Sequence, residues 1–178
     1  IKNGDLKLIL GPNIILESNF KTNIKYNEKS KNFTNLIKNF EHANNIVNLE
    51  ADLNNNVSIN LDETYKLKKY NFQSNGKIAK VNLDFKKPLK SNYLKKKIKQ
   101  LALINSEIKT SFNSKSSNTT ISGKYSLNES DLLLFNLDNI IEGELFKLKL
   151  EAEYDQPIGL ELINYNKPKN SIANFSIN

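Results

Sequence analysis

The chain has 178 residues, which suits one domain or one segment of a longer protein. Its net charge is +7, but it contains 26 Lys and no Arg, so it lacks the bidentate side chains of a specific nucleic-acid reader, and we expect no nucleic-acid partner. It has no Cys, which excludes disulfide bonds and thiolate chemistry. No apolar run is long enough to cross a bilayer, so we expect any anchor or export signal to lie outside these residues.

The N-terminal part of the chain predicts two strands joined by a turn. Leu6, Leu8 and Leu10 alternate with polar residues before Gly11-Pro12. A second alternating run extends over residues 16–26, with apolar residues on one face and only polar residues on the other. A period of two residues is typical of a strand with one buried face.

Two segments change to the helical period. Apolar residues recur at i, i+3, i+4 and i+7 within residues 32–43, which predicts a short amphipathic helix there. Leu94, Ile98 and Leu101 have a similar spacing inside a Lys-rich stretch, which predicts a second helix at about 91–100. A short amphipathic helix beside a one-sided sheet usually covers part of the open face.

Further strands are predicted between and after these helices. The tripeptide Asn54-Asn55-Asn56 and the dipeptide Asn75-Gly76 both resemble tight turns, so we expect a hairpin at each. Strand-like alternation then continues to Ile177, and it is most regular from Phe146 to Tyr154. Short turns between successive strands favour an antiparallel meander of about a dozen strands.

Catalytic or metal-binding groups are not apparent. The single histidine, His42, falls at the end of the first predicted helix, where a surface or capping role is usual. The best carboxylate cluster, Glu151, Glu153 and Asp155, fits the solvated side of a strand. The glycines form no phosphate-binding loop. We therefore expect no enzyme activity, no metal site and no cofactor.

Several strand-like segments, taken together, resemble those of a known protein family. They are Asn48–Leu53, Gly76–Phe85, Thr119–Leu127 and Leu145–Tyr154. The stretch from about residue 44 to the end resembles the AsmA-like proteins of the Gram-negative envelope, particularly the YhdP-type branch related to TamB. The resemblance implies a curved antiparallel sheet that forms an apolar groove. It also implies a protein of the periplasm, anchored in the inner membrane by an N-terminal helix and implicated in moving phospholipid toward the outer membrane, without catalytic residues.

The sequence therefore predicts a mainly β protein, a long curved antiparallel meander sheet with one apolar face, plus one or two short helices. If that face stays open, lipid acyl chains suit it, because they need burial and no hydrogen-bond donors. The expected partners are phospholipid acyl chains, and the inner and outer membranes through other parts of the protein. The alternatives are a structural or adhesive β-sandwich module and, less favoured without Trp, a carbohydrate-binding domain. The residues expected to contact lipid are Val81, Leu83, Phe85, Ile108, Phe112, Phe146, Leu148 and Leu150.

Overall fold

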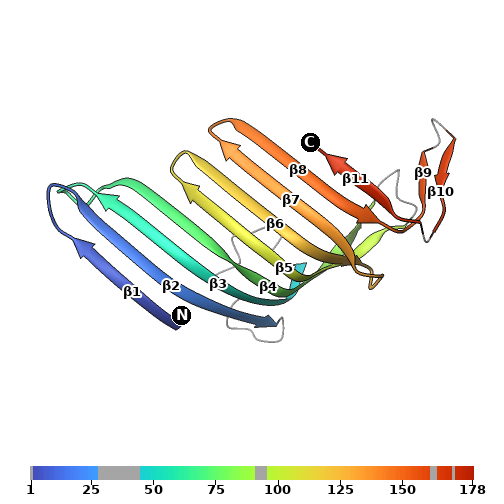
Figure 1. Ribbon diagram of the computed structural model, residues 1–178, viewed down its shortest axis with the longest axis horizontal. Helices are drawn as coiled ribbons and strands as arrows, with labels where there is room; N and C mark the ends of the chain where they lie inside the picture. The colour runs from blue at the N-terminus through green and yellow to red at the C-terminus, as the bar shows by residue number, and fades with distance from the viewer. Residues whose placement is uncertain (1, 28–44, 91–95, 161–163, 170) are drawn as a thin grey trace.

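The computed structural model describes residues 2–27, 45–90, 96–160, 164–169 and 171–178. Nine strands form one antiparallel sheet in the order β1-β2-β3-β4-β5-β6-β7-β8-β11 (Figure 1). The strands are β1 (Lys2–Ile9), β2 (Ile14–Asn27), β3 (Ile46–Leu61), β4 (Leu67–Leu89), β5 (Ile98–Asn113), β6 (Ser116–Leu127), β7 (Leu133–Glu142), β8 (Leu145–Tyr154) and β11 (Ala173–Ile177). A separate two-stranded sheet contains β9 (Ile158–Leu160) and β10 (Tyr165–Lys167). The predicted antiparallel meander is confirmed.

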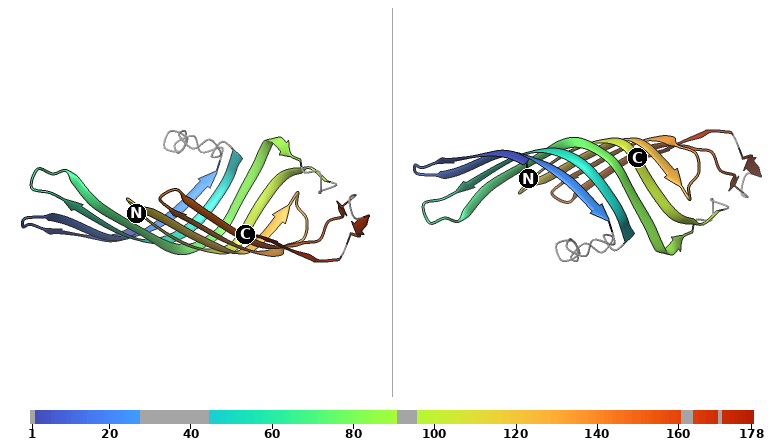
Figure 2. Two further views of the ribbon diagram at one scale, coloured as in Figure 1. Left: turned by 90° about the horizontal axis from the view of Figure 1, so that it is seen from above. Right: turned by 90° about the horizontal axis from the view of Figure 1, so that it is seen from below.

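The nine strands form a single layer, which Figure 2 shows from above and below. The solvent-accessible surface is 13005 Å², whereas the scaling for compact monomers gives about 8,800 Å² at 20.4 kDa. The excess fits a sheet that exposes much of both faces. Among the described residues the nine-stranded sheet has no second large sheet opposite it, so the facing layer that a β-sandwich needs is not in this part of the chain.

The strand register decides which side chains share a face, because directly paired residues of antiparallel strands point to the same side. Phe72 of β4 pairs with Val57 on one side and with Phe112 on the other. We call the face that carries these three residues face A. The opposite face, face B, carries Asn75 and its partner Lys109.

Both predicted hairpins in the Asn-rich region are wrong. Asn54 and Asn56 lie in the middle of β3 and pair with Asn75 and Gln73 of β4. The turn between these strands comes later, where the Asp62 carboxylate accepts hydrogen bonds from the backbone N–H groups of Thr64 and Lys66. Asn tolerates turn geometry, but it also pairs side by side across strands, so its identity alone does not mark a turn.

Gly76 serves close strand packing instead of a turn. A Cβ at this position would lie 2.0 Å from the carbonyl oxygen of Asp52 and 2.9 Å from the Cα of Leu53. Only glycine therefore allows β4 to approach β3 this closely. At Gly123 of β6, a Cβ would similarly lie 2.3 Å from the Oγ of Ser106 on β5.

Several register shifts occur along the long strands, and two of them fall away from the strand ends. The β3–β4 register shifts between Glu50 and Ala51, and the β5–β6 register shifts between Ile104 and Glu107, where Asn105 has a φ of 48°. Extra residues of this kind bend a strand and increase its twist. Figure 2 shows the long strands β2–β5 bending along their length.

The helix predicted at 32–43 lies outside the described residues. The helix predicted at about 91–100 is wrong where it can be compared, because Ile98 opens β5 and pairs with Leu89 of β4. Residues 91–95 lie outside the described part of the chain. Ile98 and Leu101 are three residues apart, which is a helical spacing, but pairing with β4 holds both residues in a strand. None of the described residues forms a helix with the length and hydropathy needed to span a membrane.

The buried core is small and lies on face A. Tyr125, Leu133 and Phe135 are its buried members, and the rings of Tyr125 and Phe135 meet edge to face at 6.0 Å. Leu101, Leu103, Ile121, Leu127, Leu137 and Ala152 pack against them, partly buried. This cluster lies on strands β5–β8, at the end of face A where β6 finishes and β7 begins. Further apolar side chains are buried on β2–β4: Ile14, Tyr26, Ala51 and Ile78.

Candidate functional site

A row of side chains on face A crosses the sheet at right angles to the strands. Each member pairs directly with the next, from β1 to β8. Six of the eight are apolar, although this part of the sheet is open to solvent. Leu6 is 73% exposed, Phe112 40% and Phe146 61%. We call this set the outer row: Leu6, Ser18, Val57, Phe72, Phe112, Ser117, Ile141 and Phe146.

Aromatic rings form the centre of the outer row. Phe72 stacks on Phe112 with ring centroids 4.7 Å apart, and Tyr70 meets Phe112 edge-on at 6.2 Å. These contacts hold three rings side by side on β4 and β5. Apolar surface held exposed in this way marks a candidate contact surface for a ligand or partner.

The predicted lipid-contacting residues are spread over face A and do not form one pocket. Seven of the eight share this face by register, whereas Phe85 lies past the last regular β4–β5 pair, Asp84–Gln100, and the register does not place it. Phe112 and Phe146 belong to the outer row. Val81 and Leu83 lie near the opposite ends of the strands, roughly 25 Å or more from the outer row at the usual rise per strand residue. The remaining three residues, Ile108, Leu148 and Leu150, lie between these two groups.

A second row, two residues further along each strand, is polar at its centre. Its eight positions are paired from β1 to β8 in the same manner. The amide of Asn55 donates to the Phe20 carbonyl at 3.2 Å and to the Thr22 hydroxyl at 2.9 Å. We call this set the polar row: Gly4, Phe20, Asn55, Ser74, Thr110, Thr119, Asn139 and Leu148.

The polar row has both paired and unpaired groups. The hydroxyls of Thr110 and Thr119 lie 2.8 Å apart and form a hydrogen bond across β5 and β6. Among the described residues, the buried Ser74 Oγ and Asn139 Oδ1 have no hydrogen-bond partner. Buried polar atoms without partners are uncommon in proteins and call for an explanation.

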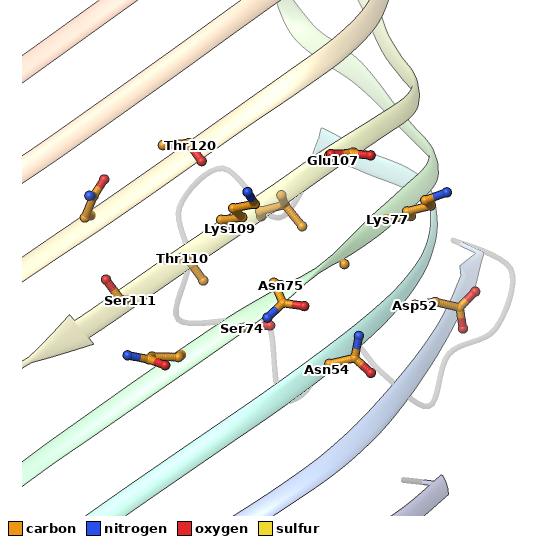
Figure 3. A pocket seen from close by; sticks show the side chains of 14 residues that line it. Asp52, Asn54, Ser74, Asn75, Lys77, Glu107, Lys109, Thr110, Ser111 and Thr120 are labelled. Atoms are coloured by element: carbon orange, nitrogen blue, oxygen red, sulfur yellow. The ribbon is translucent and has the colours of Figure 1, made fainter.

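Face B carries amides and charges, and it contains a hollow of about 720 Å³. Figure 3 shows side chains of β3, β4, β5 and β6 around it. Lys77 of β4 pairs with Asp52 of β3 on one side and with Glu107 of β5 on the other. Charges of opposite sign therefore alternate across these three strands. No aromatic residue is among the 14 that line the hollow, so it offers no stacking platform for a sugar ring.

The titratable groups with the clearest perturbation surround the core, away from the outer row. Burial, together with smaller contributions from the nearby Tyr154, Asp155 and Glu153, raises the pKa of Tyr125 to about 12. The Tyr125 hydroxyl donates a hydrogen bond to the carbonyl oxygen of Glu153. This tyrosine is therefore held neutral as a structural link between β6 and β8.

Within the described ranges, no three His, Asp or Glu side chains lie close enough together to hold a metal ion. Two of the carboxylates expected on the solvated side of a strand have partners: Glu151 pairs with Lys149 at 2.9 Å, and Glu153 accepts a hydrogen bond from the backbone N–H of Leu134.

Sequence reasoning missed most of the outer row and all of the polar row except Leu148. Alternation shows that Val57, Phe72 and Ile141 point to an apolar side of their own strands, but it does not show that they align with Phe112. Alignment depends on register, which is set by pairing between segments far apart in the sequence. Asn55 was missed for a different reason, because the sequence pattern predicted that it lies in a turn.

No family model, curated protein or solved structure matches this chain. Its class is thus defined by the structure alone. The described part of the chain is a single-layer antiparallel β-meander with amides and charges on face B and an exposed row of apolar side chains on face A.

Proposed function

We propose that this chain is a non-enzymatic lipid-binding segment of a Gram-negative envelope protein involved in phospholipid transport or outer-membrane lipid homeostasis. Acyl chains lie on face A, along the outer row. The protein acts in the periplasm, and parts outside these residues connect it to the inner and outer membranes. The periplasmic location is proposed because the strand-like segments resemble those of AsmA-like proteins.

The exposed outer row carries the proposal. Leu6, Phe112 and Phe146 keep large apolar side chains in water, and the middle of the opposite face carries amides and charges such as Asn75 and Lys109. Burial of such surface contributes about 25 cal/mol per Å², so covering it with an acyl chain is favourable. An acyl chain also brings no polar group that would need a partner.

The shape of the surface favours a chain-like ligand over a compact one. The outer row is continuous across eight strands, and neighbouring strands are about 4.8 Å apart. It is therefore roughly 34 Å long and one side chain wide. An extended hydrocarbon chain matches this form, and headgroups lie at its margin in water.

The proposal is tested by the lipid that stays with the protein during purification from cell envelopes. We expect phospholipid in the wild-type protein and several-fold less in Phe112→Ser, because that change removes the central ring of the outer row. Leu134→Ser is the matched control, since Leu134 is 52% exposed but lies on face B, opposite Lys124. Thermal unfolding of both variants checks that the sheet is intact.

A protein that is always free of lipid, and whose outer row does not react with a hydrophobic photo-crosslinker, would contradict the proposal. That result would instead favour the β-sandwich alternative, in which another protein layer covers face A.

A further inference from the structure

We propose that the polar row binds the ester groups of a diacylglycerol-based lipid whose acyl chains lie along the outer row. This inference rests on the proposed function and names the part of the lipid that face A recognises. The residue that carries it is Ser74, supported by Asn139.

The two rows have the spacing that such a ligand needs. Phe72 and Ser74 are two residues apart on β4, as are Ile141 and Asn139 on β7. At 3.2–3.4 Å per residue, the rows run parallel about 7 Å apart. An ester carbonyl at the polar row therefore places the first methylene groups of its acyl chain beside the outer row.

Ser74 has an unused hydrogen-bond donor at this place. The residue is 95% buried, since only 5% of it remains exposed, and among the described residues its hydroxyl has no partner. Register directs it to face A, between Asn55 and Thr110. An ester carbonyl accepts hydrogen bonds and donates none, which matches a free hydroxyl donor.

Asn139 repeats the arrangement on β7. Its Oδ1 is also buried without a partner among the described residues. The terminal torsion of an Asn side chain is broad, so a rotation of the amide can present the NH₂ donors instead. Ser74 and Asn139 are three strands apart, roughly 14 Å, so one row offers two separate ester positions.

The remaining members of the polar row are accounted for by structure alone. Thr110 and Thr119 bond to each other, and Asn55 bonds to Phe20 and Thr22, so these contacts fix the register of β2–β3 and β5–β6. The Ser74 side chain has no such role, because its hydroxyl bonds to none of the described residues. A ligand contact explains its place on face A.

Titration calorimetry with two soluble lipids tests the inference. The first is dioctanoyl phosphatidylcholine, and the second is its dioctyl ether analogue, which has the same headgroup and nearly the same chains but no carbonyls. We expect the wild-type chain to bind the ester at least about fivefold more tightly, the equivalent of roughly one net hydrogen bond. Ser74→Ala should remove this preference and leave ether binding unchanged.

If Ser74 had only a structural role, Ser74→Ala would lower the melting temperature and leave the ester preference unchanged. The ester site predicts the opposite. Ser74→Ala should not lower the melting temperature, because it removes an unpaired buried hydroxyl. Ser122→Ala, an exposed serine paired with Glu107 on face B, is the matched control and should keep the ester preference. Asn139→Leu should reduce the preference independently.

The outcomes separate this inference from the proposed function. If both lipids bind equally to the wild type, or if Ser74→Ala keeps the ester preference, the ester site is wrong while lipid binding stands. If neither lipid binds, the proposed function fails and the ester site fails with it.

Discussion

Gly76 and Asp52 lie so close that a Cβ on Gly76 would be 2.0 Å from the Asp52 carbonyl oxygen. The contact joins β3 and β4, the two strands that carry Val57 and Phe72 of the outer row. Backbone atoms cannot yield as a flexible side chain does, so any larger residue must push the strands apart.

We therefore expect Gly76→Ala to lower the free energy of unfolding by about 3 kcal/mol, the upper end of the usual cost of overpacking. Denaturant unfolding measures the change. Gly11→Ala is the control, because its Cβ would have only one neighbour, the Asn13 carbonyl oxygen at 3.8 Å. Equal stabilities for the two variants would show that β3 and β4 do not approach as described.

Tyr125 should make stability fall at high pH. Burial raises its pKa to about 12 in the folded state, above the value of 10.0 for an unperturbed tyrosine. A raised pKa contributes stability that is fully present below about pH 10 and is lost as the pH rises toward 12. Solvent screening at this partly solvated hydroxyl reduces the effect, so we expect the loss of stability to be about 1–2 kcal/mol.

Chemical unfolding between pH 8 and 12 tests this expectation against Tyr125→Phe. The variant should be less stable at pH 8, because the hydrogen bond to the Glu153 carbonyl is lost, but its stability should vary less above pH 10. A wild type and variant with parallel pH curves would contradict the assignment.

Asn55 and Asn56 are neighbours in sequence with different expected roles. Asn55 is buried and donates to Phe20 and Thr22, whereas Asn56 is exposed on face B and donates to the Asn19 side chain at 2.6 Å. We expect Asn55→Ala to cost about 1–3 kcal/mol and Asn56→Ala about 0.5 kcal/mol or less. Thermal or denaturant unfolding measures both.

The same pair distinguishes the strand from the hairpin that the sequence predicts. In a hairpin, both residues would occupy an exposed turn, and the two substitutions would have similar small effects. Comparable stabilities would therefore contradict the extended path of β3.

Local pattern was sufficient for the strands and the meander, but not for their ends. Alternation is a property of each strand alone, so the phases of β2 and β8 could be predicted. The full length of β3 and β4 could not, because Asn54–Asn56 and Asn75-Gly76 adopt extended backbone through pairing with each other. The close approach that requires Gly76 is visible only in three dimensions.

The candidate site was predictable only in part for a related reason. Phe112 and Phe146 were expected to contact lipid, and they lie in one row, whereas Val81 and Leu83, which were also expected to contact lipid, lie far along the strands. Strand register, which depends on segments far apart in the sequence, determines such rows. The Ser74 position within the polar row needs the same knowledge.

We expect the outer row to be open in the lipid-free protein and covered by lipid when lipid is bound. Because the chain has no Cys, a single introduced thiol can be labelled uniquely. Phe146→Cys places it in the outer row, and Leu134→Cys places it on face B of the neighbouring strand; the natural side chains are 61% and 52% exposed.

The most direct measurement is the rate at which a soluble maleimide labels these two variants, with and without dioctanoyl phosphatidylcholine. We predict rapid labelling of both without lipid, and protection by lipid of Phe146→Cys alone. Equal rates for Phe146→Cys with and without lipid, or a slow rate in the lipid-free protein, would contradict the account.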